Sequence, residues 1–292
     1  MAELVKIVEC PRDAFQGFTR FIPTERKVAH LRTLIASGFD HIDFGSFVSP
    51  KAVPQMADTE QVLEQLEVPD GVRLIGIIAN ERGLDRLLAC PGVHEAGYPF
   101  SVAESFQKRN TGLDLADSRT LVARLAERAR AAGRKLIVYV SMAFGNPDGD
   151  PWSEESVARD VAGLAELGVP TISLADTVGV AEPEKVRSVV AACRSAAPRC
   201  ELGLHLHARP ERFQEKLDAA LGAGCRRFDS ALGGVGGCPF AGDDLVANIP
   251  TEHLVRSLEQ RGFAATVSAQ SLQPALDSAR RIAAEFGNKR GG

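Results

Sequence analysis

Short apolar and β-branched runs alternate with longer amphipathic segments along almost the whole chain. Runs of the first kind are typical of buried strands, and the longer segments carry their apolar residues at helical spacing. Glycine follows several of the helical segments, and proline or serine precedes others, as helix ends and starts favour. The expected strands are Lys6–Cys10, His41–Gly45, Arg73–Ala79, Glu95–Phe100, Lys135–Met142, Thr171–Asp176, Glu201–His207 and Arg226–Leu232, and the expected helices include Thr24–Ser37, Leu115–Ala132, Glu154–Leu167, Pro183–Ala196 and Pro210–Ala223.

Eight strand–helix units follow one another without a long interruption, and this order predicts the fold. Alternating strands and helices build a parallel sheet, and eight such units typically close into a barrel. No linker or low-complexity segment divides the chain. We therefore predict an α/β fold, a (β/α)₈ TIM barrel that makes residues 1–292 a single domain. The barrel is expected over about residues 5–235, followed by a functional loop and extra C-terminal helices over residues 236–292.

Polar residues mark the expected ends of several strands. A barrel of this kind carries its chemistry at the carboxyl ends of its strands and in the loops that follow them. The polar residues agree with that rule. The agreement is informative because the polar residues are identified by residue type and the strands by periodicity. They are Arg12, Asp13, Asp43, Ser141, Asp176, His205, His207 and Asp229.

Size, charge and cysteine content narrow the class of protein. The 292 residues suit one large barrel or two ordinary domains. A net charge of −4 argues against a general nucleic-acid binder, although a polyanionic ligand needs only a local cationic patch. The sequence contains no run of about eighteen apolar residues, so it predicts no membrane-spanning helix. With no cleavable hydrophobic leader and six cysteines that form no CxxC pair, we expect a cytoplasmic protein with free thiols, although a mature organellar form would look the same.

Two histidines at the end of the seventh expected strand form a candidate metal site. His205 and His207 are two residues apart and therefore project to the same side of a strand. The pair alone is a weak signal, because hydrogen-bonded core histidines give the same pattern. Asp13 offers a carboxylate from a neighbouring position, since strand eight closes onto strand one, and Asn248 offers an amide oxygen. Two nitrogen and two oxygen ligands favour Mg²⁺ or Mn²⁺, and Zn²⁺ is less expected because no cysteine cluster accompanies them.

A glycine-rich loop follows the eighth expected strand, from Gly233 to Phe240. So many glycines indicate a backbone that bends sharply, approaches a ligand closely or moves as a lid. It is not a phosphate-binding P-loop, because no Gly-Lys-Ser/Thr follows. Cys238 on this loop is either a small buried thiol or a group that carries a proton near the metal. Its position above the expected site favours the chemical role.

Together these segments resemble the hydroxymethylglutaryl-CoA lyases, within a wider group of metal-dependent barrel lyases and Claisen synthases that share an Arg-Asp pair on strand one. The resemblance runs nearly end to end, and the loop after strand two is its most lyase-specific part. The matching residues are Pro11-Arg12-Asp13 with Gln16, Ser46–Lys51 with Val53–Met56, Phe106 with Lys108, Arg109 and Asn110, Tyr139–Ser141, Ser173–Val180, His205 with His207, Gly236–Pro239, and Asn248 before Thr251-Glu252.

The chain departs from the family pattern at several positions that surround the expected substrate pocket. Asp43 stands where these lyases carry glutamate, and Cys10 stands where they carry glycine. Ala14-Phe15 replaces the usual Gly-Leu, and Ala208-Arg209 follows the metal strand where Asp-Thr is common. The loop between Cys238 and Asn248 is one residue longer than usual. These changes bear on the substrate more than on the reaction type.

The resemblance implies an oxo-acid lyase that cleaves 3-hydroxy-3-methylglutaryl-CoA, or a close 3-hydroxy-3-alkylglutaryl-CoA, to acetyl-CoA and acetoacetate. In this metal-assisted retro-Claisen reaction Arg12 stabilises the thioester oxygen, Asp43 orients Arg12, and Cys238 handles a proton. The base that takes the hydroxyl proton is His205, Asp13 or metal-bound water.

Other residues receive roles by resemblance or by their loop positions. The resemblance adds Tyr139 and Asp176 to the catalytic candidates and implies a homodimer. Positive and polar side chains on loops at the expected mouth are candidates for binding the acyl-CoA thioester. They are Gln16, Ser49, Lys51, Lys108 and Arg109.

Three rival functions are open to this sequence. A Claisen-type synthase would condense acetyl-CoA with a 2-oxo acid, but the Gly-Gly-Cys-Pro loop and the lack of a long C-terminal regulatory domain argue against it. A lyase for a larger 3-hydroxy-3-alkylglutaryl-CoA is compatible with the departures around the pocket. A catalytically silent relative that binds metal or acyl-CoA would be expected to lack Arg12, Asp13 or Cys238, and all three are present.

Overall fold

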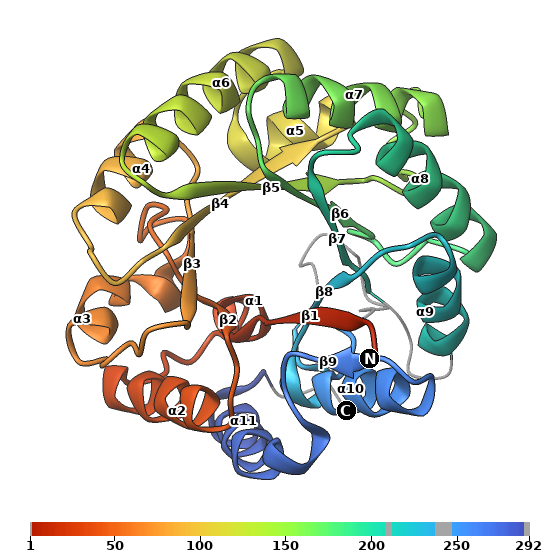
Figure 1. Cartoon of the computed structure of the whole chain (residues 1–292). Coiled ribbons are helices and arrows are strands. Elements are labelled where there is room, and N and C mark those ends of the chain that lie inside the picture. The colour runs from red at the N-terminus through yellow and green to blue at the C-terminus, as the bar shows by residue number, and fades with distance from the viewer. Residues whose placement is uncertain (1, 208–211, 237–246, 289–292) are drawn as a thin grey trace.

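Eight parallel strands form the centre of the computed structural model, which describes residues 2–207, 212–236 and 247–288. Each strand pairs with the next, and β1 pairs with both β8 and β2, so the sheet closes into a ring (Figure 1). This confirms the predicted (β/α)₈ TIM barrel. The strands are β1 (Leu4–Glu9), β2 (His41–Ser46), β3 (Arg73–Ile77), β4 (Glu95–Ser101), β5 (Lys135–Ser141), β6 (Thr171–Ala175), β7 (Glu201–His205) and β8 (Arg227–Ser230).

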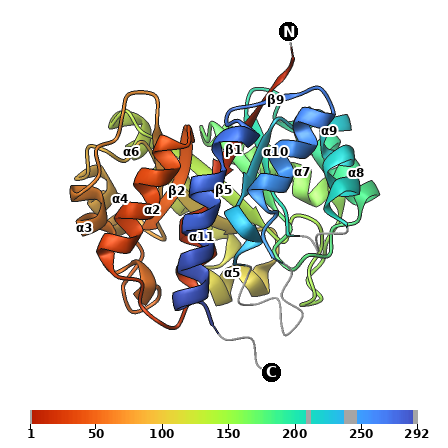
Figure 2. The ribbon, with the colours of Figure 1, turned by 90° about the horizontal axis from the view of Figure 1, so that it is seen from below.

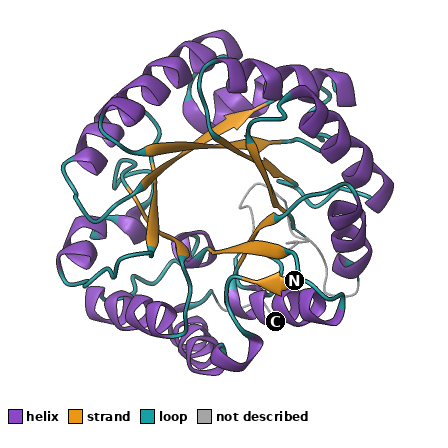
Figure 3. Cartoon of the chain, in the orientation of Figure 1, coloured by secondary structure: helices purple, strands orange, loops and turns teal. Residues whose placement is uncertain are grey.

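Helices surround the ring of strands on all sides (Figure 3). Most follow one strand and lead to the next, as the alternating pattern predicts. The helices between strands are α1 (Pro11–Gln16), α2 (Thr24–Ala36), α3 (Thr59–Glu64), α4 (Glu81–Leu88), α5 (Glu104–Thr111), α6 (Leu115–Ala131), α7 (Glu154–Glu166), α8 (Pro183–Ala196) and α9 (Phe213–Gly222), with a short 3₁₀ helix η1 (Pro54–Met56) before α3.

The structure adds short helices that periodicity does not reveal. Helices α3, α4 and α5 have six to eight residues each, too few to show a clear helical repeat. The segment after β1, predicted as a strand end, is instead the helix α1, which Pro11 starts because its fixed φ suits a first helical position. Helix α9 is described from Phe213, and its predicted start at Pro210 lies outside the described residues.

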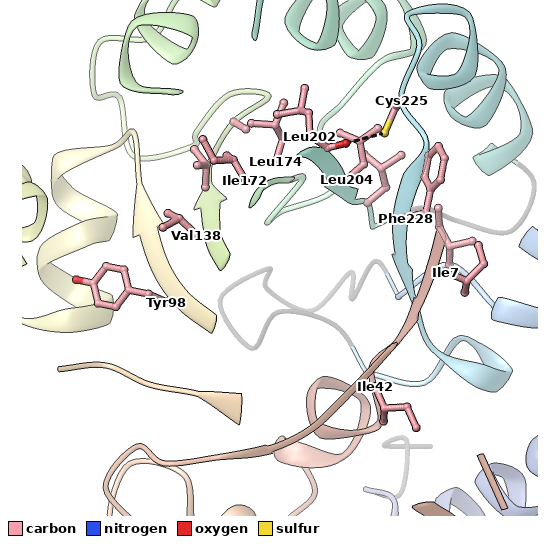
Figure 4. Close-up of a cluster of buried hydrophobic side chains, with 14 of the residues drawn as sticks. Ile7, Ile42, Tyr98, Val138, Ile172, Leu174, Leu202, Leu204, Cys225 and Phe228 are labelled. Carbon is pink, nitrogen blue, oxygen red and sulfur yellow. Dashed lines mark hydrogen bonds between the residues drawn. The ribbon is translucent and has the colours of Figure 1, made fainter. Parts of the chain in front are cut away.

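The main hydrophobic core lies between the outer face of the barrel and the helices. Figure 4 shows side chains of this layer, including Ile7, Ile172, Leu204 and Phe228, each of them fully buried. Burial of apolar area at about 25 cal/mol per Å² is the main force that holds the helices to the strands. Tyr98 in the same layer hydrogen-bonds through its hydroxyl to Ser118 on α6, at 2.9 Å.

The predicted extra C-terminal helices are present as α10 (Thr251–Gln260) and α11 (Gln273–Phe286). Between them the short strand β9 (Ala264–Ala265) pairs with β1, and the 3₁₀ helix η3 (Ala269–Ser271) leads into α11. Helix α11 lies along the outside of the barrel beside α2 (Figure 2). In the described part of the chain, no helix is long and apolar enough to cross a membrane.

A buried carboxylate joins β1 to the segment that follows the barrel. Glu9 accepts a hydrogen bond from the backbone N–H of Leu232, at 2.8 Å, in the 3₁₀ helix η2 (Leu232–Gly234). Its other oxygen accepts from the hydroxyl of Thr251, at 2.6 Å, at the start of α10. Burial raises the pKa of Glu9 to about 8, because the two hydrogen bonds do not offset the cost of removing its charge from water.

The raised pKa of Glu9 predicts a pH dependence of stability. Between its ordinary value of 4.5 and about 8 the folded protein binds a proton that the unfolded chain has lost. Stability therefore falls as pH rises through this window, by up to about 1.4 kcal/mol per pH unit from this group. Glu9→Gln resembles the protonated acid in shape, with one acceptor oxygen and one donor group, and carries no charge. Urea unfolding should show a larger free energy of unfolding for the variant, relative to wild type, at pH 8 than at pH 5.

The matched control is Glu67→Gln, which neutralises an exposed carboxylate. It should leave the pH dependence of the unfolding free energy as in the wild type. An identical pH dependence in the wild type and Glu9→Gln would contradict a buried Glu9 that resists ionisation.

Candidate active site

A pocket of about 460 Å³ opens at the carboxyl ends of the barrel strands. Its polar wall includes Arg12 and Asp13 on α1, and His205 at the end of β7. Apolar side chains from the loop after β2 and from the end of β3 line another part of it. The pocket lies where a barrel of this type carries its chemistry, because loops at this end vary without disturbing the core.

Arg12 is held in place by two carboxylates. Its Nε lies 3.1 Å from both carboxylate oxygens of Asp43, and a second guanidinium nitrogen lies 2.5 Å from one of them. The third nitrogen contacts Asp13 and Gln16, each at 3.1 Å. Burial opposes the charge on Arg12, but Asp43 and Asp13 outweigh it and raise the pKa of the guanidinium. The pocket therefore contains a fixed, permanent positive charge.

Asp43 makes this contact although it is one methylene shorter than the family glutamate. It lies on β2, where the pairing with β3 becomes irregular between Asp43 and Gly45, and it is buried. Gly45 leaves room at this point for Thr59, because a Cβ at residue 45 would lie 2.7 Å from the Thr59 methyl group. The sequence departure at Asp43 thus leaves the predicted Arg12–Asp43 pair intact.

Asp13, His205 and His207 offer ligand atoms that all lie within 4.8 Å of one another. Nδ1 of His207 lies 2.9 Å from the backbone carbonyl of Asp176, and donation to that oxygen leaves Nε2 with a free lone pair. Nε2 of His207 is buried and has no hydrogen-bond partner among the described residues. An unpartnered imidazole nitrogen beside a carboxylate and a second imidazole fits a divalent metal ion.

Charge interactions favour an ionised carboxylate in this group. Burial acts to raise the pKa of Asp13, but Arg12, His205 and His207 lower it to about 2. Burial also opposes the charge on His205, but Asp229 and Asp13 raise its pKa. Asp13 is therefore ionised and can bind a cation. A metal ion and a proton would compete for the imidazole nitrogen of His205.

Asn248 brings the chain back to the metal group after the glycine-rich loop. Its amide nitrogen donates to Asp13, at 2.9 Å, and to the carbonyl of Val235, at 3.0 Å. Gly236 has a φ of +88°, and a Cβ there would lie 2.7 Å from Cα of Ala14, so only glycine fits. Asn248 adjoins the predicted ligands, and its role as a ligand stays a prediction.

Two further catalytic candidates take different positions. The hydroxyl of Tyr139 is buried and has no hydrogen-bond partner within residues 2–207, 212–236 and 247–288, in a side chain that lines the pocket. Burial, together with nearby carboxylates, raises the pKa of Tyr139 well above its ordinary value, so the phenol stays neutral. The carboxylate of Asp176 instead accepts from Lys216, at 2.9 Å, and from the N–H of Ala181, at 3.0 Å. Asp176 supports His207 through its backbone and does not line the pocket.

Of the predicted acyl-CoA-binding residues, Gln16 lines the pocket and the other four do not. Lys108 pairs with Glu104 at 2.8 Å, and Arg109 pairs with Asp148 at 3.0 Å. Ser49 and Lys51 lie in the loop after β2. Their part in binding acyl-CoA stays a prediction. Cys238, the predicted proton carrier, lies outside the described residues.

Sequence reasoning did not assign roles to several polar residues around the metal group. Lys216 on α9 is buried and donates to the carbonyl of His207, at 3.0 Å, as well as to Asp176. Asp229 was singled out only as a strand-end carboxylate, and it lies 3.5 Å from Nδ1 of His205. Arg227 and Asp229 are two residues apart on β8, so both side chains point into the barrel with His205. This spacing is a sequence signal that could have identified Asp229 as part of the site.

A family model described as HMGL-like matches residues 5–278. The chain belongs to the HMGL-like family. Hydroxymethylglutaryl-CoA lyase of Pseudomonas mevalonii is 31% identical over 286 residues, which cover 98% of this chain and 93% of the relative. A 3-hydroxy-3-isohexenylglutaryl-CoA/hydroxy-methylglutaryl-CoA lyase of Pseudomonas aeruginosa is 32% identical over 98% of this chain and 94% of the relative.

Solved structures of related proteins give the same result. The crystal structure of the HMG-CoA lyase from Brucella melitensis superposes with a TM-score of 0.90 at 32% identity, over 96% of this chain and 99% of that chain. The HMGL-like protein is therefore a lyase with a TIM-barrel fold. Relatives with an identity near 31% are named for different acyl groups, so this identity alone does not establish the substrate.

Asp13, His205 and His207 of this HMGL-like lyase predict one divalent-metal site that depends on His207 and can be probed with Mn²⁺. Chelator-stripped protein should bind Mn²⁺ in a calorimetric titration, and His207→Ala should weaken binding about 100-fold because it removes an imidazole ligand. The control is His253→Ala, which removes an exposed histidine stacked on Phe213. Equal affinity in His207→Ala and the control would exclude His207 as a ligand.

Proposed function

We propose that this HMGL-like lyase cleaves 3-hydroxy-3-methylglutaryl-CoA to acetyl-CoA and acetoacetate. The main observation in its support is the Arg12–Asp43 pair beside the group of Asp13, His205 and His207. A permanent cation and a cation-binding group next to each other suit a substrate that has a hydroxyl, a carboxylate and a thioester within a few bonds. The names of the two relatives and the Brucella structure agree with this substrate.

Asp13, His205 and His207 would hold Mg²⁺ or Mn²⁺, with Asn248 as the fourth residue of the set. Mixed oxygen and nitrogen ligands without cysteine suit these ions better than a structural zinc site. When bound, such an ion acidifies the substrate hydroxyl and orients the substrate.

Arg12 stabilises the negative charge that forms as the carbon–carbon bond breaks. A base such as His205 or Asp13 takes the hydroxyl proton, and the tertiary carbon becomes the ketone carbon of acetoacetate as its bond to the neighbouring carbon breaks. The electron pair of that bond passes to the thioester as an enolate. Among the described residues that line the pocket, Arg12 is the only lysine or arginine. Because Asp43 fixes the guanidinium before the reaction, no reorganisation is needed when the enolate oxygen becomes negative.

Tyr139 supplies a neutral donor from β5, and its ring centroid lies 6.4 Å from that of His205. Its unpartnered hydroxyl can donate a hydrogen bond to a substrate oxygen, since its raised pKa keeps the proton on the phenol. Cys238 on the glycine-rich loop would return a proton to the enolate carbon and complete acetyl-CoA.

A second candidate substrate is a 3-hydroxy-3-alkylglutaryl-CoA with a longer alkyl group. The pocket has an apolar wall, formed by Val48, Ala52 and Val53 after β2 together with Ile77 and Ala79 at the end of β3. Because β3 lies across the barrel from the histidines of β7, a substituent that points away from the metal group would meet this wall. Its two alanines leave space for more than a methyl group, and a volume of about 460 Å³ is compatible with this.

Turnover tests the proposed substrate. Chelator-stripped wild-type protein should form acetoacetate and acetyl-CoA from 3-hydroxy-3-methylglutaryl-CoA after addition of Mg²⁺ or Mn²⁺. Arg12→Lys should lower kcat about 10²–10³-fold with a smaller change in KM, because the charge remains but the forked donor geometry is lost. Arg130→Lys, on an exposed part of α6, is the matched control and should turn over as the wild type does.

Absence of turnover by wild-type protein that binds Mn²⁺ would contradict the proposed substrate. The same assay with longer 3-alkyl analogues then tests the second candidate. Wild-type-like kcat in Arg12→Lys would contradict the role of Arg12 in stabilising the enolate.

A further inference from the structure

Asp229 is a fully buried carboxylate behind the metal group, inside the barrel. One of its oxygens accepts from Arg227, at 2.9 Å. The other accepts from the hydroxyl of Ser173, at 2.9 Å, and faces Nδ1 of His205 at 3.5 Å. Asp229 therefore contacts His205 on the side of the ring opposite to Nε2, which faces Asp13 at 3.9 Å.

A chain of alternating charges runs from the opposite end of the barrel to Asp229. Lys6 pairs with Glu201 at 2.5 Å, and Glu201 lies 3.6 Å from Nε of Arg227. Arg227 is 1% exposed and in turn binds Asp229. Each buried charge in the chain has an opposite charge beside it, which a buried ion requires to remain charged.

Gly203 lets Arg227 take this path. It occupies the inward position of β7 between Glu201 and His205, and a Cβ there would lie 2.8 Å from one guanidinium nitrogen of Arg227. The missing side chain on β7 thus makes room for the arginine that compensates Asp229.

Nδ1 of His205 is buried and has no hydrogen-bond partner among the described residues. At 3.5 Å from Asp229 it is too far for a full hydrogen bond but close enough for a strong charge interaction. An imidazole that binds a metal through Nε2 carries its remaining proton on Nδ1, which a neighbouring acceptor stabilises.

We propose that Asp229 is a positioning residue that keeps the proton of His205 on Nδ1 and so directs the lone pair of Nε2 to the metal. This inference rests on the metal site of the proposed function and not on the acyl group cleaved. It assigns the buried Arg227 the task of holding the Asp229 carboxylate in place and balancing its charge, and Glu201 in turn lies beside Arg227.

A carboxylate is required here because Asp229 faces donors with both oxygens. An asparagine has one oxygen and one NH₂ group. Charge places the oxygen against Arg227, so the NH₂ group faces Ser173 and His205. The positive partial charge of the NH₂ group then favours a lone pair on Nδ1 of His205 and the proton on Nε2, where the proton blocks the metal.

The test is Mn²⁺ binding to chelator-stripped Asp229→Asn, measured by calorimetry without substrate. Affinity should fall about 10–100-fold relative to wild type. The control is Tyr98→Phe, which also removes a buried polar contact from a strand, but on the outer face of the barrel. It should bind Mn²⁺ as the wild type does. Unchanged Mn²⁺ affinity in Asp229→Asn, or an equal loss in both variants, would overturn the proposal.

A second measurement uses the unaltered protein and does not depend on the folding of a variant. In ¹⁵N-histidine-labelled protein loaded with Mg²⁺, nitrogen chemical shifts should show His205 protonated at Nδ1 and unprotonated at Nε2. The opposite assignment would overturn the proposal. Neither measurement involves substrate, so a wrong substrate in the proposed function would leave both results as predicted.

Discussion

The site depends on one buried interaction, the clamp of Arg12 between Asp43 and Asp13. A guanidinium removed from water is stable only beside compensating charge, and here two structural elements supply it, β2 through Asp43 and α1 through Asp13. Asp13 then has a second function, because its other oxygen faces His205 and Asn248. The arginine proposed to stabilise an enolate and the proposed metal ligands therefore share one carboxylate, and displacement of either would disturb the other.

The closed barrel makes this sharing possible. Residues that are far apart in sequence, such as Asp13 and His205, meet because β1 pairs with β8, and β8 with β7. Strand alternation does the rest, since it sends His205 and Asp229 to the interior and leaves Phe228 for the outer core. Inside the barrel, buried charges such as Asp229 lie near a small apolar cluster of Val8, Cys10, Ile75 and Ile137, and most of the buried apolar area lies between the strands and the outer helices. The candidate active site and the main hydrophobic core thus lie on opposite faces of the same strands.

Sequence patterns predicted the barrel and the assembly of the main site residues, because eight repeated units and the polar strand ends both follow simple periodic rules. Such rules do not predict contacts that need a missing side chain on a neighbouring strand. The path of Arg227 to Asp229 requires Gly203 on another strand, and a lone glycine in a strand gives no sign of which side chain will cross it. Lys216 on α9 has the residue type of a solvent-facing position, yet it is buried against Asp176 because the strand end it covers presents a carboxylate and a free carbonyl.

A double-mutant cycle on cleavage of 3-hydroxy-3-methylglutaryl-CoA tests the central claim, that Asp43 acts through Arg12. In the wild-type background, Asp43→Asn should lower kcat/KM at least about tenfold, because the guanidinium loses its fixed orientation. In the Arg12→Lys background the same change should alter kcat/KM by no more than about twofold, since the positioned group is already absent. Losses that multiply in the double variant would contradict the account, because they would show that the two residues contribute independently.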